Sequence, residues 1–189
     1  MDYTELTASM TAAGAASPTD DRLFWIGNPA IHSIRRRLID IAREDARVVA
    51  KGIHWVKQDR SEAWSSETLM DTAASNYVSL PDHCRYKYLI DLEGIGYSAR
   101  LKVLLFSNRP VFIQERPRRE FFFDWLQPYV HFVPVKRDLS DLSSQLDWAE
   151  ANPETCRDIA SRAQTLARKH LTRQAAIAYF RQSILSMLS

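Results

Sequence analysis

Glycine, serine and arginine residues stand together in a short turn near the middle of the chain. The mostly apolar segment 86–92 is followed by Gly94 and Gly96, and then by Ser98 and Arg100 at the start of a predicted helix. Glycines let a backbone approach a ligand, amides at a helix N-terminus attract anions, and arginine supplies a fork of donors. These residue types in this order predict a site for a diphosphate.

The same turn also fits the pattern G-x-G-x-x-A, which is typical of dinucleotide-binding folds. Glu115 stands 19 residues beyond Gly96, where such folds place the acid that binds the ribose. An NAD(P)-dependent oxidoreductase is therefore an alternative interpretation, and only this pattern and this acid support it.

Strands alternate with helices around the turn. The apolar, β-branched and aromatic runs predict strands over 23–26, 52–56, 86–92, 111–114 and 131–135. Helical spacing and capping residues predict helices from residue 31, over 65–75, over 98–106, from residues 138 and 153, and over 173–188. We therefore expect an α/β fold, a Rossmann-like parallel sheet with flanking helices. Ligands bind beyond the carboxyl ends of such strands, which is where the glycine turn lies.

Length and charge limit the classes of protein. The 189 residues suffice for one domain, which we place over residues 22–189 behind a flexible N-terminal tail over 1–21. With 25 basic and 23 acidic residues, the net charge of +2 gives nucleic-acid partners no support. No apolar run approaches the roughly 20 residues of a transmembrane segment, and the first residues do not form a secretion signal.

Cysteine and histidine usage narrows the chemistry further. Cys84 and Cys156 are widely separated and are expected to be reduced thiols, which suggests a cytoplasmic location. His, Cys and carboxylate residues do not cluster with the spacing of metal ligands. The spacing therefore gives no support to a metal site.

Several segments occur in an order that resembles a known family. They are FWIGN over 24–28, YKYLIDLEGIGYSARL over 86–101, LQPYVHFVPV over 126–135 and DLSDL over 138–142. Together they resemble the CAP10-type glycosyltransferases, glycosyltransferase family 90, which include protein O-glucosyltransferases and capsule xylosyltransferases. The resemblance spans about residues 23 to 188.

The resemblance implies one half of a GT-B architecture, the half that binds the donor. This half would hold a UDP-sugar, as the donor substrate, with neither a metal ion nor a cofactor. The enzyme would transfer the sugar to an acceptor hydroxyl with inversion. By position, the donor diphosphate would be bound by Gly94, Gly96, Ser98 and Arg100. The nucleoside and the sugar would be bound by Asp91, Glu93, Glu120, Gly27 and Arg35, with Glu120 on the ribose.

The family's other half carries the acceptor site and the general base, so the catalytic residues remain unassigned in this sequence. We expect an acceptor-binding partner half, or a homo-oligomer, to supply them. A non-catalytic module that only binds a nucleotide-sugar is the alternative from a different functional class.

Overall fold

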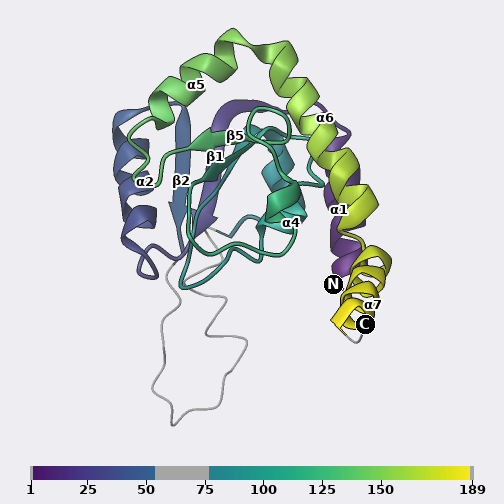
Figure 1. Cartoon of the computed structure of the whole chain (residues 1–189). Coiled ribbons are helices and arrows are strands. Elements are labelled where there is room, and N and C mark those ends of the chain that lie inside the picture. The colour runs from purple at the N-terminus through teal and green to yellow at the C-terminus, as the bar shows by residue number, and fades with distance from the viewer. Residues whose placement is uncertain (1, 54–76, 188–189) are drawn as a thin grey trace, which may run out of the picture.

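A sheet of five parallel strands forms the centre of the computed structural model, which describes residues 2–53 and 77–187. The strands are β1 (Asp20–Gly27), β2 (Val48–Gly52), β3 (Tyr86–Asp91), β4 (Val111–Gln114) and β5 (Val133–Val135). They lie in the order β2-β1-β3-β4-β5, and each neighbouring pair is parallel (Figure 1). The predicted α/β fold with a Rossmann-like sheet is confirmed.

Both faces of the sheet are buried, which explains why its strands are apolar rather than alternating with polar residues. In β1, Phe24 and Ile26 belong to one apolar cluster, whereas Leu23 and Trp25 belong to another on the opposite face. The two-residue period of a strand sends neighbouring side chains to opposite faces. The sheet therefore needs a helical layer on each side.

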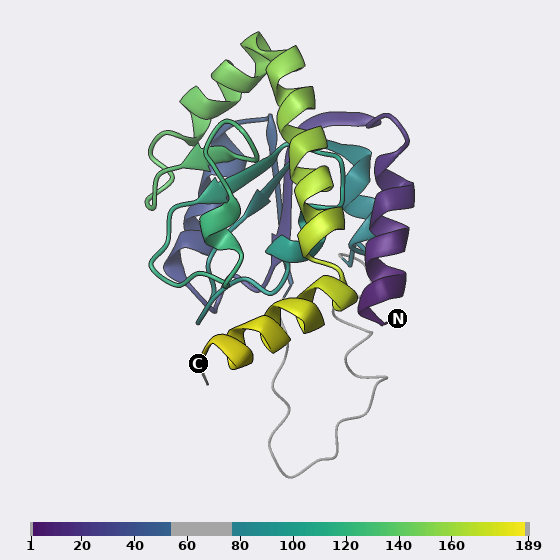
Figure 2. The same cartoon turned by 45° about the vertical axis from the view of Figure 1, so that its right-hand side comes forward.

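Two layers of helices cover these faces (Figures 1 and 2). The layer that packs on Phe24 contains α1 (Tyr3–Gly14), α4 (Leu101–Leu104) and the C-terminal half of α6 (Pro153–His170), whose first turns pack on the opposite face. The layer that packs on Trp25 contains α2 (Ser33–Glu44) and α5 (Leu142–Ala151). Two short 3-10 turns, η1 (Pro81–Arg85) and η2 (Phe123–Trp125), precede β3 and β5.

The prediction of a flexible tail over residues 1–21 is wrong for most of that segment. Residues 3–14 form α1, which begins with a capping box in which Asp2 and Glu5 each accept a hydrogen bond from the other's backbone amide. Met10 is fully buried, and the Tyr3 hydroxyl donates a 2.7 Å hydrogen bond to the Leu171 carbonyl at the end of α6. These tertiary contacts stabilise a helix whose composition alone is not distinctive.

Other element boundaries also differ from the predictions. The second strand occupies 48–52 rather than 52–56, and residues 54–56 and the predicted helix over 65–75 lie outside the described residues. The helix predicted over 98–106 is the four-residue α4, preceded by an irregular loop. That loop matters for the site because it carries the glycine turn.

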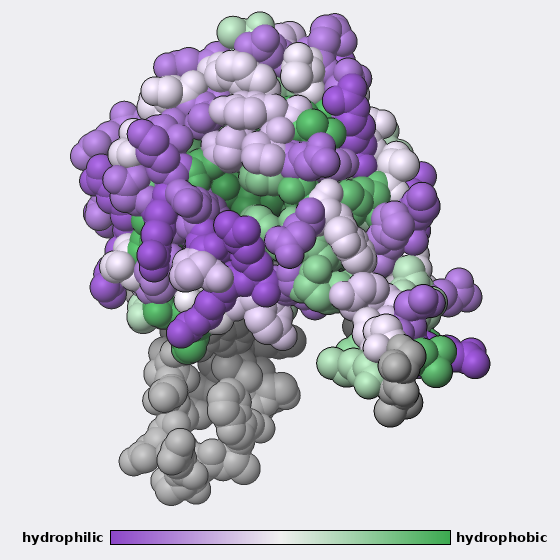
Figure 3. Space-filling model, in the orientation of Figure 1, coloured by the Kyte–Doolittle hydropathy of each residue, from purple (hydrophilic) through white to green (hydrophobic). Residues whose placement is uncertain are grey.

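The last helix, α7 (Arg173–Met187), has no buried residue. Six of its large apolar side chains are exposed: Ile177, Tyr179, Phe180, Ile184, Leu185 and Met187. Apolar surface is visible on this helix at the lower right of Figure 3. Over the described residues, none of the helices has the length and apolar character needed to cross a membrane.

Candidate functional site

The strand order creates a crevice between the carboxyl ends of β1 and β3. From β1 the chain moves to β2 on one side, and it returns to place β3 on the other side of β1. The loops that follow β1 and β3 therefore diverge, and ligands of open α/β sheets bind at such switch points. The loop after β1 begins at Gly27, and the loop after β3 contains Glu93, Gly94 and Ser98.

Asp91, the last residue of β3, organises this crevice. Its side chain is fully buried, and its two oxygens have different partners. The Ser98 hydroxyl donates to Oδ1 over 2.6 Å, and Arg116 Nη2 donates to Oδ2 over 2.5 Å. Because the Ser98 proton is directed to Asp91, the Ser98 oxygen turns only lone pairs toward a ligand, and a phosphate contact requires its hydroxyl to rotate.

Two arginines join the two loops across the crevice. Arg100 Nη1 donates to the Ile26 carbonyl at the end of β1 over 2.5 Å. In the opposite direction, Arg35 Nε, at the start of α2, donates to the Glu93 carbonyl over 2.9 Å. The predicted donor residues from both loops are therefore brought together.

The electrostatics of these arginines favour an anion. Burial lowers the pKa of Arg35 and of Arg100 from the ordinary value, and the positive charge of Arg100 lowers that of Arg35 further. Asp91 opposes the shift in both, but it forms no ion pair with either. Two partly desolvated and incompletely compensated guanidinium groups are stabilised when an anionic ligand binds.

Glu93 is a second buried carboxylate in the crevice. Its Oε1 lies 3.7 Å from His32 Nε2, 3.7 Å from Arg137 Nε and 3.5 Å from Gln114 Nε2. These three side chains come from the loop after β1, the loop after β5 and the end of β4. His32 Nδ1 accepts a hydrogen bond from the Ile34 amide, so its proton is on Nε2, which faces Glu93.

The three glycines of the prediction have different surroundings. A Cβ atom on Gly27 would stand 2.7 Å from the Trp25 ring, and one on Gly94 would stand 3.0 Å from Arg35 Nη2. A Cβ atom on Gly96 would meet nothing within 4 Å, and none of the glycines has a positive φ. Gly27 and Gly94 thus leave room for neighbouring side chains, whereas Gly96 leaves open space.

The helix that was expected to begin at Ser98 does not contribute a strong dipole. Its four residues begin after Arg100, so Ser98 belongs to the preceding loop and is not an N-cap. Side chains hold that loop instead, including Arg118, which donates from Nη1 to the Ile95 carbonyl. The anion-binding potential of the crevice therefore comes from arginines more than from helix amides.

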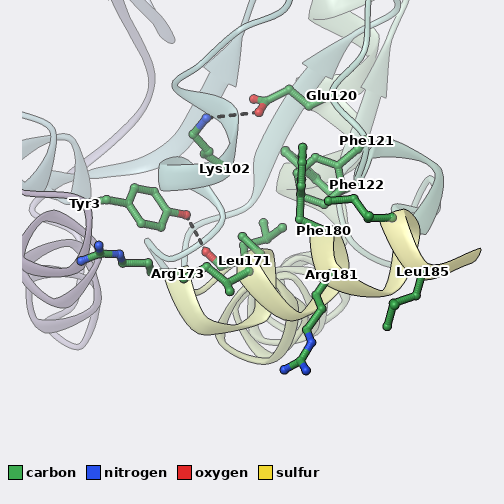
Figure 4. A pocket seen from close by; sticks show the side chains of 13 residues that line it. Tyr3, Lys102, Glu120, Phe121, Phe122, Leu171, Arg173, Phe180, Arg181 and Leu185 are labelled. Carbon is green, nitrogen blue, oxygen red and sulfur yellow. Dashed lines mark hydrogen bonds and ion pairs between the residues drawn. The ribbon is translucent and has the colours of Figure 1, made fainter. Parts of the chain in front are cut away.

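Glu120 differs from the other predicted donor residues because it lies beside another cavity and pairs with a residue outside the crevice. Its Oε2 pairs with Lys102 Nζ over 3.2 Å, and its Oε1 is buried without a hydrogen-bond partner in the described part of the chain. Burial raises its pKa. Glu120 lines an apolar cavity of about 830 Å³ between Tyr3, Phe122 and α7 (Figure 4).

A second cavity, of about 410 Å³, lies at the carboxyl ends of β4 and β5. Its walls include Gln114 and the rings of Phe123 and Phe132. The Gln114 side chain also makes two hydrogen bonds to the backbone. Its Nε2 donates to the Arg137 carbonyl over 2.7 Å, and its Oε1 accepts from the Glu93 amide over 3.0 Å. Through Gln114 this cavity adjoins the crevice.

Several residues of the site were not assigned to it from the sequence, among them Arg116, His32, Gln114 and Arg137. Arg116 belongs to a basic run with Arg118 and Arg119, a pattern typical of a solvated surface, but the Arg116 side chain is only 1% exposed. Its place directly after a strand was the available signal, since that position is at the carboxyl edge of the sheet. Nothing in the sequence links His32 to Glu93.

Comparison with known proteins gives consistent results for family and fold. Human protein O-glucosyltransferase 1 is 34% identical over 157 residues, which cover 82% of this chain and 38% of that protein. O-glucosyltransferase rumi of Drosophila melanogaster is 31% identical over 151 residues, which cover 78% of this chain and 36% of that protein. The chain thus spans little more than a third of the length of these relatives.

Among solved structures, HepE of Anabaena in complex with UDP-glucose matches this chain with a TM-score of 0.55 at 12% identity. The match covers 100% of this chain and 53% of HepE. TarM matches with a TM-score of 0.56 at 12% identity, over 88% of this chain and 35% of TarM. At this identity the likeness concerns the fold alone, and it supports the expected α/β half of a GT-B architecture.

The oxidoreductase alternative gains no support from the structure. The dinucleotide pattern marks the first strand–helix turn of its fold, whereas here it follows β3 and precedes a four-residue helix.

The model of the family described as "Glycosyl transferase family 90" matches residues 15–186, which is almost the whole sequence. The chain therefore belongs to glycosyltransferase family 90.

Proposed function

We propose that this chain binds a UDP-sugar in the crevice between β1 and β3 and contributes that donor to glycosyl transfer. The observation that carries the proposal is the pair formed by Arg35 and Arg100, whose charges are only partly compensated. They lie at the switch point of a sheet in a chain of glycosyltransferase family 90. HepE, which shares the fold, is known in complex with UDP-glucose.

In the proposed reaction the acceptor hydroxyl attacks the anomeric carbon and loses its proton to a base. The new glycosidic bond forms as the bond from the anomeric carbon to the diphosphate breaks, and UDP departs with the bonding electrons. Negative charge therefore develops on the diphosphate, where Arg35 and Arg100 would stabilise it. Because the fixed charges are guanidinium groups, we propose that donor binding needs no metal ion.

We further propose that the nucleoside occupies the cavity at the ends of β4 and β5, and that the sugar lies toward Glu93. Aromatic rings and the Gln114 amide in that cavity suit a uracil, which has a flat face and polar edges. Ribose contact by Glu120 stays a prediction, since its carboxylate pairs with Lys102. Inversion at the anomeric carbon and cytoplasmic location likewise stay predictions.

The acceptor site and the general base are proposed to lie on a further polypeptide body, whether joined to this chain or separate. The longer relatives support this, because this chain matches only 38% of human protein O-glucosyltransferase 1 and 53% of HepE. The exposed apolar side chains of α7 also support it, since a packed neighbour would remove them from water. A non-catalytic binding module remains the alternative function.

Isothermal titration with UDP tests the donor site. We expect wild type to bind UDP with and without EDTA, and Arg100→Ala to bind roughly 10- to 100-fold more weakly, the size of a lost charged hydrogen bond. The matched control is Arg162→Ala, which removes an exposed arginine on α6. Equal affinity in wild type and Arg100→Ala would remove the basis of the proposal, and tighter binding of NADH than of UDP would favour an oxidoreductase.

A further inference from the structure

The ion pair between Asp91 and Arg116 lies beneath the proposed phosphate site and is sealed from water. The exposed fraction of the side chain is 0% for Asp91 and 1% for Arg116, and Nη2 lies 2.5 Å from Oδ2. Arg116 comes from the loop after β4, whereas Asp91 ends β3. The pair therefore joins two neighbouring carboxyl ends of the sheet.

Asp91 acts electrostatically on the arginines of the crevice without forming an ion pair with them. It raises the pKa of both Arg35 and Arg100, although burial lowers them more. Its contacts in the described structure are to Arg116 and to Ser98. The negative charge of Asp91 is thus shared between a close partner, Arg116, and two more distant ones.

Arg116 itself does not use its full hydrogen-bonding capacity. Its Nη1 is buried and has no hydrogen-bond partner in residues 2–53 and 77–187. If a buried guanidinium served only to join two loops, a hydrogen bond from each of its N–H donors would stabilise the fold further. What Arg116 contributes most clearly is a positive charge against Asp91.

We propose that Arg116 is a positioning residue for donor binding: it neutralises Asp91, so that the positive charges of Arg35 and Arg100 act on the diphosphate and are not offset by Asp91. The inference rests on the proposed UDP-sugar site. Without Arg116, the charge of Asp91 would act on Arg35 and Arg100 alone, and the crevice would attract an anion less. Arg116 acts through Asp91 and makes no contact with the ligand in this scheme.

The proposal predicts an opposite response to two changes of charge. Arg116→Met leaves the charge of Asp91 uncompensated, and we expect it to weaken UDP binding by on the order of tenfold or more. A nearby charge commonly shifts a pKa by one unit or more, and one unit corresponds to a factor of ten in an equilibrium constant. The Asp91 side chain is 0% exposed, so this scheme gives it no contact with the ligand, in place of the contact that the family resemblance implied. Asp91→Asn then removes only the competing charge, and UDP should bind at least as tightly as in wild type. The double variant Asp91→Asn with Arg116→Met is neutral at both positions and should recover UDP affinity to within about threefold of wild type.

Isothermal titration of these three variants with UDP and with uridine tests the scheme, and Arg162→Met is the matched control on the surface of α6. Uridine is uncharged. If the substitutions act on UDP binding through charge, the affinity for uridine should therefore not change in any variant. A substitution that distorts the loop would weaken the binding of uridine as well. Arg116→Lys keeps the charge without the planar fork, and it should retain most of the UDP affinity.

Unchanged UDP affinity in folded Arg116→Met would overturn the proposal, as would a double variant that binds as weakly as Arg116→Met. If Arg116→Met does not fold, which circular dichroism reports, the comparison of wild type with Asp91→Asn and Arg116→Lys decides. A clear loss of UDP affinity in either then rejects the scheme. Failure of wild type to bind UDP would instead reject the proposed function.

Discussion

His83 should make the stability of this protein sensitive to mild acid. It lies in η1, buried, with its ring edge-to-face against Phe24 at a centroid distance of 4.9 Å. Its Nε2 has no hydrogen-bond partner among the described residues. Burial, and secondarily the charge of Arg100, lowers its pKa from 6.5 to about 3. The folded state therefore keeps His83 neutral at pH values where the unfolded chain takes up a proton.

The size of the effect follows from the two pKa values. The free energy of unfolding contributed by His83 is complete above pH 6.5 and is lost as the pH falls toward about 3. Each pH unit in that window costs about 1.4 kcal/mol, so acidification to about pH 4.5 should remove roughly 2.7 kcal/mol. That is a large part of the stability of a typical domain.

Urea unfolding at neutral pH and at about pH 4.5 measures this loss in wild type and in His83→Phe. We expect the loss attributable to His83 to disappear in His83→Phe, which leaves the smaller effects of the carboxylates. His170→Phe is the matched control, because it replaces a half-buried histidine at the end of α6 and leaves His83 in place. Equal acid losses in wild type and His83→Phe would refute the reasoning.

Three further predictions concern stability and reactivity. Arg109 donates five hydrogen bonds to four backbone carbonyls, so Arg109→Met should lower the free energy of unfolding by roughly 3 kcal/mol or more in urea titrations; no change would contradict this. A Cβ on Gly14 would stand 2.0 Å from the Ser107 carbonyl oxygen, so Gly14→Ala should lower the melting temperature. An unchanged melting temperature would count against this packing of α1. Burial raises the pKa of both Cys84 and Cys156 to about 11, so a thiol reagent at about pH 8 should label them only after unfolding, and rapid labelling of the native protein would disprove it.

The position of the site followed from the sequence because it depends on topology. A turn directly after a buried strand must lie at the carboxyl edge of a parallel sheet, whatever the details of its neighbours. For this reason the crevice gathers Gly27, Arg35, Glu93, Ser98 and Arg100 as the sequence predicted. Their roles toward a donor are still proposals, since position alone does not show contact with a ligand.

The parts that were not predicted depend on partners distant in sequence. The residues of α1 are rich in Thr and Ala, and the helix gains stability from contacts such as the one between Tyr3 and Leu171. Arg116 is buried because Asp91, 25 residues away, needs a counter-charge. Glu120 faces Lys102 because of how the loop after β4 folds over α4. No local pattern encodes these pairings.

Because α7 is exposed, detaching this helix should cost less free energy than opening the sheet. The helix buries no residue, and its Tyr179 ring meets the sheet-bearing body at Phe121 and Trp125, with centroid distances of 4.9 and 5.7 Å. Detaching it exposes little further apolar surface, whereas opening the sheet exposes both clusters. Backbone amides of α7 should therefore exchange with solvent deuterium by a local opening, long before those of β3, whose exchange requires global unfolding.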